Sequence, residues 1–189
     1  MAQFTHILFP KKELSVLYTF VTSLLLSFSL PTSAQTELQL SIDSLDDATS
    51  EVRRMHQLFT LYDDWRYENY PESATSAGIK KYNDQWTDMS LQAIEQRQRD
   101  TRIFAKAIAD GDTSGMEEQE KLNYLIFHRQ MDNSVAGQAF PHELIPVSNT
   151  TFIGMQHRIP GLLSRMPAND EADYRNTLLR MRGASDLID

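Results

Sequence analysis

The sequence predicts a mainly α-helical fold, an array of about four to five helices with an irregular or short-β stretch near residues 140–160. Three observations lead to this fold class. Apolar residues recur at spacings of three and four over most of the chain after residue 48, as they do on one face of a helix. Residues that cap or break helices stand at the ends of these segments. The composition, 41% hydrophobic and 23% charged, is typical of a globular protein.

The first 34 residues have the features of a secretory signal peptide. A basic pair, Lys11–Lys12, precedes the apolar run 14–30, and small residues lead up to Ala34. We expect cleavage after Ala34 and export to the periplasm or the medium, with no membrane association afterwards. The alternative is an uncleaved anchor, since a run of this length can nearly span a bilayer. The Ser and Thr residues inside the run argue against that alternative.

Residues 35–47 are polar with scattered Leu and Ile, and we expect a flexible lead-in there. The first helix is predicted to start at Ala48 and to end at Pro71, whose ring clashes with a preceding helical turn. Its apolar stripe comprises Val52, Met55, Phe59, Tyr62 and Trp65. A turn over 71–78 follows, with Gly78 expected in the left-handed conformation.

Two further helices are predicted in the middle of the chain. Ser90 is expected to cap a helix that ends at Asp110–Gly111, and the polar middle of this helix, residues 95–100, is expected to be solvated. Ser114 is expected to cap the next helix. The predicted core face of that helix comprises Leu122, Leu125, Ile126 and Phe127.

The C-terminal part alternates between irregular and helical patterns. Prolines and β-branched residues in 140–160 predict an extended stretch with one short strand pair. Residues 162–166 are expected to form a helical turn that ends at Pro167. Asn169 is expected to cap a last helix. The apolar face of that helix comprises Tyr174, Leu178, Met181 and Leu187 or Ile188. Because this face remains open up to the last residue, we expect the chain to be a fragment of a larger protein.

Composition excludes several classes of function. The chain has no cysteine, which excludes disulfides, cysteine-ligated zinc, iron–sulfur clusters and thiol nucleophiles. The net charge of −8 argues against nucleic-acid binding, because an acidic chain repels phosphate backbones.

No residue type and spacing predicts a catalytic, cofactor-binding or metal site. His142–Glu143 begins like the helix motif of zinc proteases, but Pro146 stands where the second histidine ligand is needed. His128, His142 and His157 stand far apart in the sequence, and their spacing matches no compact metal site.

One aromatic and acidic cluster remains as a candidate binding surface. Asp63 and Asp64 stand beside Trp65, Tyr67 and Tyr70, which could line a sugar or peptide cleft. Successive helical residues point about 100° apart, so the two carboxylates cannot easily share a substrate atom. The simpler interpretation is a set of core aromatics beside a solvated acidic face.

Several short motifs, taken in order, resemble the start of the bacterial Domain of Unknown Function 885 family. They are LF and YDDW within 58–65, YPESAT at 70–75 with Gly78, YND at 82–84, WTDMS at 86–90 and EKLNY at 120–124. Pro146–Val147, Met166–Pro167 and Asp173–Tyr174 resemble later landmarks of the family. The resemblance covers residues 55–189, which is most of the chain after the leader.

The resemblance implies a longer, mostly helical protein that looks like a zinc-dependent peptidase. Its metal motif, similar to His-Glu-Ala-x-Pro-Gly-His-His, lies far toward the C-terminus, and nothing in this sequence matches it. No catalytic or metal-binding residue is therefore carried over, and zinc is expected only in a full-length relative.

Residues 48–189 are then expected to be the helical N-terminal portion of a larger domain, inactive alone. Its partner would be the C-terminal portion of the parent fold, and peptide the substrate of the full-length form. In such a protein these helices would form one wall or lid of a substrate cleft. The alternative is a free-standing periplasmic binding or scaffold domain without catalysis, whose first-helix aromatics bind peptide or glycan.

Overall fold

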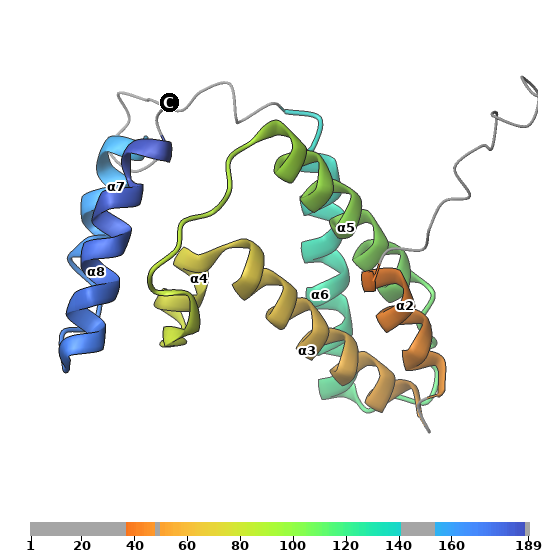
Figure 1. Cartoon of the computed structure of the whole chain (residues 1–189). Helices are drawn as coiled ribbons and strands as arrows, with labels where there is room; N and C mark the ends of the chain where they lie inside the picture. Colours follow the sequence, from red (N-terminus) through yellow and green to blue (C-terminus); the bar gives the residue numbers. More distant parts are fainter. Residues whose placement is uncertain (1–36, 48–49, 141–153, 188–189) are drawn as a thin grey trace, which may run out of the picture. The chain divides into compact units, whose positions relative to one another are not determined.

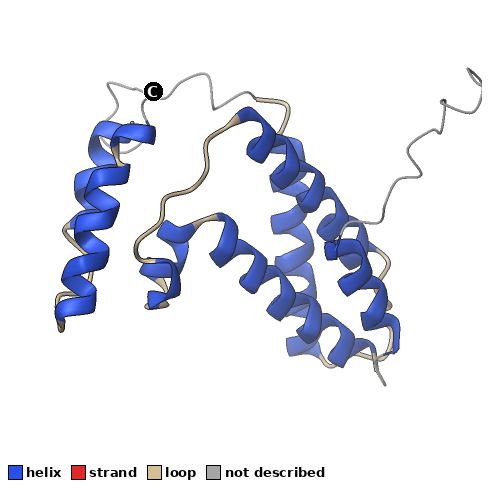
Figure 2. Cartoon of the chain, in the orientation of Figure 1, coloured by secondary structure: helices blue, strands red, loops and turns tan. Residues whose placement is uncertain are grey.

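The computed structural model describes residues 37–47, 50–140 and 154–187 (Figure 1). The chain divides into residues 1–36 and a unit formed by residues 37–189, and all the described residues belong to the second unit. The expected signal peptide lies outside the described residues. Within them there are seven α-helices and no strand, which confirms the mainly helical fold class (Figure 2). None of the helices in this part is both long and apolar enough to cross a membrane.

The segment expected to be a flexible lead-in is helical. It forms α2 (Glu37–Asp43) and the 3-10 turn η1 (Ser44–Asp47). Ile42 is buried, and Leu38 and Leu45 pack against the same hydrophobic core. These three residues recur at spacings of four and three, so the prediction was wrong although the helical pattern is present in the sequence.

The first long helix, α3 (Glu51–Asn69), agrees with the predicted pattern. Ser50 caps it by accepting a hydrogen bond from the backbone N–H of Arg53. The predicted stripe faces the core, where Met55 is buried. The other members of the stripe, Val52, Phe59, Tyr62 and Trp65, are partly buried against that core.

The predicted turn after α3 contains a short helix, α4 (Pro71–Ser76), with Pro71 in its first turn. Proline is well tolerated there because the first helical N–H groups have no partner within the helix. Gly78 has φ +80°, which confirms the predicted left-handed conformation. The 3-10 turn η2 (Lys80–Tyr82) follows, and residues 77–90, named the connector below, lead to α5.

The two central helices, α5 (Leu91–Ala109) and α6 (Glu118–Gly137), pack along each other (Figure 1). Ser90 caps α5 as predicted, because its side chain accepts a hydrogen bond from the Ala93 N–H. The buried core joins α2, α3, α5 and α6 and consists of Ile42, Met55, Leu58, Phe104, Ala107, Ile108, Met116, Phe127 and Met131.

The polar middle of α5 was expected to be solvated, and this prediction holds for Glu95 and Arg99, which are exposed, but is wrong for the opposite face of the helix. Arg97 and Asp100 are each only 6% exposed. The indole N–H of Trp65 donates a hydrogen bond to Asp100, and the ring of Tyr70 lies beside the Arg97 guanidinium. Aromatic side chains of α3 and its C-terminal cap therefore cover a face that composition alone assigns to solvent.

Two predictions for α6 also need correction. The helix begins at Glu118 and is not capped by Ser114, which hydrogen-bonds Asp112 instead. Of the four residues predicted for its core face, only Phe127 is buried. The other three, Leu122, Leu125 and Ile126, are exposed. Met131, one turn beyond Phe127, completes the buried face.

The C-terminal helices are α7 (Met155–Leu163) and α8 (Glu171–Gly183), followed by the 3-10 turn η4 (Ser185–Leu187). Residues 155–160 are helical, in place of the expected extended stretch, and residues 141–153 lie outside the described residues. The N-cap of α8 is Asp170 and not Asn169, because the Asp170 carboxylate accepts a hydrogen bond from the Asp173 N–H at 2.8 Å.

Candidate functional site

The connector is fixed to α4 by buried polar contacts. The Glu72 carboxylate accepts hydrogen bonds from both the backbone N–H and the hydroxyl of Thr87. The Thr75 hydroxyl donates to Oδ1 of Asn83 at 2.8 Å, and Asn83 is almost fully buried. Two side chains of a six-residue helix therefore hold the connector at two points.

Arg180 of α8 also forms hydrogen bonds with α4 and the connector. Its side chain is 0% exposed and donates to the carbonyl oxygens of Gln85, at 2.6 Å, and Tyr82, at 2.9 Å. A further bond of 2.7 Å reaches the Thr75 hydroxyl. Burial lowers the pKa of Arg180, although an arginine remains charged at neutral pH. The Trp86 indole N–H donates to the Arg180 carbonyl oxygen, so backbone and side chain of this residue both bind the connector.

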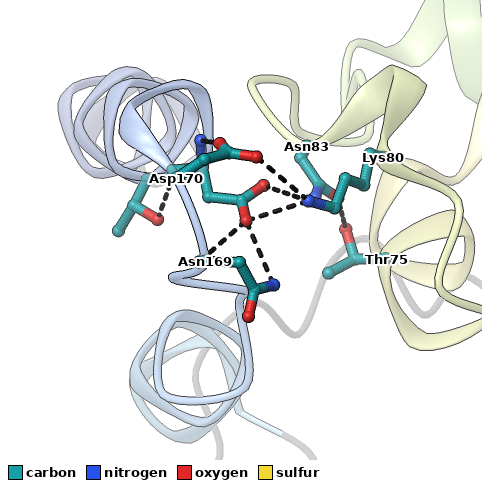
Figure 3. A network of polar contacts seen from close by, with 7 residues as sticks. Thr75, Lys80, Asn83, Asn169 and Asp170 are labelled. Carbon is teal, nitrogen blue, oxygen red and sulfur yellow. Dashed lines mark hydrogen bonds and ion pairs between the residues drawn. The ribbon is translucent and has the colours of Figure 1, made fainter.

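An ion pair joins η2 to the start of α8 (Figure 3). Lys80 Nζ lies 2.8 Å and 2.9 Å from the two carboxylate oxygens of Asp173, and 3.8 Å from an oxygen of Asp170. Asp173 also accepts a hydrogen bond from the Asn169 N–H. Lys80 and this N–H hold the pKa of Asp173 below its usual value, and Asp173 in turn raises the pKa of Lys80.

A cleft of about 960 Å³ lies beside this cluster and is lined by residues of α3 to α7, the connector and η4. Its size is within the range of small-ligand and peptide pockets. Five aromatic residues contribute to its lining: Tyr62, Trp65, Tyr70, Trp86 and Phe140. The chain has two tryptophans, and both therefore lie at this cleft.

The cleft is cationic although the chain is acidic. Its charged lining consists of four arginines, Arg66, Arg97, Arg158 and Arg165, and one carboxylate, Glu72. Glu72 is already engaged by Thr87. The cleft therefore concentrates positive charge within a chain of net charge −8.

Two of these arginines lack the partners that buried guanidinium groups normally have. The Arg97 guanidinium lies 5.3 Å from the centre of the Tyr70 ring, and no described residue accepts a hydrogen bond from its side chain. Nε of Arg66 is buried and has no hydrogen-bond partner among the described residues. The Arg97 guanidinium, which lines the cleft, therefore has donors available to a ligand, whereas Nε of Arg66 is enclosed by the protein.

The predicted aromatic and acidic cluster is divided by the fold. Trp65 and Tyr70 line the cleft, whereas Asp63 and Asp64 are exposed and are not part of its lining. The simpler interpretation is therefore right for the carboxylates.

Of the three histidines considered above, the structure describes His128 and His157. His128 lies 3.2 Å from Asp132, a neighbour on its own helix, and His142 is outside the described residues. In the described part of the chain no three His, Asp or Glu side chains are placed to hold a metal ion. The sequence-based search also missed Arg97, although it lies on the helical stripe 97, 101, 104 and 108, which is buried along its length.

Residues 71–189 match the profile of the family described as "Bacterial protein of unknown function (DUF885)". The chain belongs to this family. No curated protein and no solved structure matches it. The DUF885 match begins at Pro71 and so includes α4, the connector and α8, with all the polar contacts that bind them. The motif at 58–65 lies before the matched residues.

Proposed function

We propose that this DUF885 chain is the peptide-binding helical part of an exported zinc-dependent peptidase and is inactive by itself. The observation that supports binding is the cleft, in which the Arg97 guanidinium lies beside the ring of Tyr70 and further aromatic side chains complete the lining. Aromatic rings bind the apolar parts of a peptide, and arginines its carbonyl and carboxylate oxygens. The peptidase class rests on the resemblance, and export on the leader.

The described residues do not fit a zinc site, since they bring no three suitable side chains together. Ligands for zinc would have to come from elsewhere in the protein. The role left to this part of the chain is to bind and orient the substrate, as one wall of the substrate cleft.

An exposed apolar stripe on α8 supports the proposal that this helix packs on a further part of the protein. Tyr174, Leu178 and Met181 recur at spacings of four and three and are each more than half exposed. Exposed apolar faces of this kind mark interaction surfaces. We propose that the stripe packs on a C-terminal portion of the parent fold.

The test of peptide binding uses the emission of the two tryptophans at the cleft. The purified protein is titrated with an extended octapeptide of mixed sequence and, separately, with a chito-oligosaccharide. Saturable change with the peptide supports the proposal. Change with the oligosaccharide alone would favour the rival, a free-standing glycan-binding domain.

Two further measurements test the remaining parts of the proposal. Metal analysis should find less than one equivalent of zinc on this chain, and one tightly bound equivalent would contradict the assignment of zinc to another part of the protein. N-terminal sequencing after expression with the leader should begin at Gln35. An unprocessed N-terminus in the membrane fraction would contradict export with cleavage.

A further inference from the structure

Arg97 is a buried cation that the fold leaves without a paired carboxylate. It is 6% exposed and lines the cleft. Transfer of an unpaired charge from water into a protein interior is costly, so buried arginines are normally paired. The next buried residues on the same stripe of α5 are Thr101 and Phe104, which carry no charge. Packing of α5 against the core therefore does not require an arginine at position 97.

Two acidic residues that could pair with Arg97 are occupied by other donors. Asp100 accepts hydrogen bonds from the Trp65 indole at 3.0 Å and from the Gln96 amide at 2.8 Å. Glu72 binds the backbone N–H and hydroxyl of Thr87. Both carboxylates therefore serve structural contacts, and the guanidinium keeps its donors for the cleft.

A third carboxylate, Asp88, lies within electrostatic range of Arg97 but forms no ion pair with it. Hydrogen bonds from Ser90 are the main reason that the pKa of Asp88 is lowered, and the charge of Arg97 is a smaller one. The Ser90 N–H donates to Asp88 Oδ1 at 2.8 Å. Asp88 is exposed, and an exposed carboxylate compensates a buried charge only weakly.

The surroundings of Arg97 indicate which kind of anion fits. Tyr70 lies against its guanidinium, and the Trp65 ring contacts Tyr70 edge-on with 6.0 Å between the ring centres. Arg66 adds a second cation with a buried, unpartnered Nε. A planar carboxylate matches the fork of an arginine, and an adjacent peptide segment matches the aromatic faces.

We propose that Arg97, supported by Arg66, binds a carboxylate group of the peptide, so that the cleft selects peptides with an acidic side chain. This inference rests on the proposed peptide-binding function and names the chemistry that the cleft selects. Phosphate shares the charge and oxygen geometry of a carboxylate, so the test separates the two anions.

The experiment titrates the tryptophan emission of the purified protein with two blocked peptides, acetyl-Ala-Glu-Ala-Glu-Ala-amide and its Gln counterpart, and with inorganic phosphate. The Glu peptide should bind about tenfold or more tightly than the Gln peptide, as expected when a charge-assisted hydrogen-bond pair is lost. Arg97→Gln should abolish this preference, whereas Arg97→Lys, which keeps the charge but loses the fork, should reduce it.

The matched control is Arg99→Gln, two residues further along the same helix. Arg99 is half exposed, pairs with Glu95 and does not line the cleft. Its variant should keep the full preference for the Glu peptide. An equal loss in both variants would overturn the proposal, because it would reduce the preference to general attraction between charges.

A folding readout separates binding from structure. Because Arg97→Gln removes an unpaired buried charge, its Tm should not fall below that of the unaltered protein. A lower Tm together with an unchanged peptide preference would make Arg97 a structural residue and overturn the proposal.

The remaining outcomes distinguish this inference from the function on which it rests. Equal binding of the Glu and Gln peptides would overturn carboxylate selection and leave peptide binding intact. Failure of both peptides to bind would remove the proposed function as well. Phosphate that binds as tightly as the Glu peptide, and depends on Arg97, would overturn the assignment to a peptide carboxylate.

Discussion

Gly78 is a single residue on which the turn between α4 and the connector depends. Its φ of +80° is unfavourable for residues with a side chain, and nothing lies within 4 Å of an added Cβ. Gly78→Ala should therefore destabilise the fold by about 1 kcal/mol through backbone strain alone. Urea unfolding measures the change.

The matched control for that substitution is Gly137→Ala at the end of α6. This glycine also has open space around it, but its φ is not positive. The exchange should leave the fold unchanged or stabilise it by up to about 1 kcal/mol. If both variants lost equal stability, the strain assigned to Gly78 would be contradicted.

Asp173 gives the stability of the protein a predictable dependence on acid pH. Its pKa is lowered from 3.8 by Lys80 and by the Asn169 N–H, so the folded state binds the proton less readily than the unfolded state. The stabilisation is complete above pH 3.8 and is lost as the pH falls through the lowered value. Asp173 raises the pKa of Lys80, so the lysine is charged at neutral pH and over the whole acid range.

Asp173→Asn should therefore lower the Tm at pH 7 and flatten its decline in acid, which thermal unfolding across a pH series measures. The comparison is Glu171→Gln, an exposed position on the same helix that contacts Arg175. It should leave the acid decline unchanged. An equally steep decline in the Asp173 variant would contradict the role of this ion pair.

At the scale of elements, the buried side chain of Arg180 makes several of the hydrogen bonds between α8 and the connector. Arg180→Met removes the donors to Gln85 and Tyr82 and leaves their carbonyl oxygens without this partner. The expected loss is on the order of 3 kcal/mol, because several charge-assisted hydrogen bonds are broken in a buried place.

The control for α8 is Arg175→Met, an exposed position on the same helix paired with Glu171. This substitution should change stability by less than about 1 kcal/mol. The unfolding free energy of both variants is measured in urea. A loss for Arg180→Met no larger than for Arg175→Met would show that the buried contacts of α8 contribute little.

The elements that the sequence predicts well are those with one dominant apolar stripe and a clear cap. The stripe of α3 and the Ser90 cap of α5 belong to this class. The start of α3 does not, because Ala48 was expected there and the cap is Ser50. Prediction failed for α6, where Leu122, Leu125, Ile126 and Phe127 cover more than one face of the helix. Contacts with α3 and α5 decide which of them are buried, and local spacing along the chain does not predict these contacts.

The site was less predictable than the fold for a related reason. The aromatic residues Trp65 and Tyr70 were identified, but as neighbours of Asp63 and Asp64 and not of Arg97. The partner that matters lies on α5, which is distant along the chain. A charged residue within a polar segment is expected to be exposed to solvent. Only the position of Arg97 on a helical stripe of buried residues indicates that it is buried.

For the molecule as a whole, the exposed apolar stripe of α8 predicts self-association. Tyr174, Leu178 and Met181 are exposed apolar residues on one face of α8, and exposed apolar faces of this kind mark interaction surfaces. Leu178→Glu should reduce concentration-dependent association, which sedimentation velocity measures. Ala172→Glu, an exposed position off the stripe, introduces the same charge and should leave association unchanged. Equal effects of the two variants would contradict the role of the stripe.

The central claim is that the cleft binds peptide. The most direct measurement records the two indole N–H resonances, of Trp65 and Trp86, in ¹⁵N-correlated NMR spectra during titration with the acidic peptide. Peptide binding in the cleft predicts saturable shifts of Trp65 Nε1–H and of backbone amides around Tyr70 and Arg97, with the 112–115 loop unaffected. Shifts confined to that loop or to the exposed face of α8, with the Trp65 resonance unmoved at saturation, would contradict it.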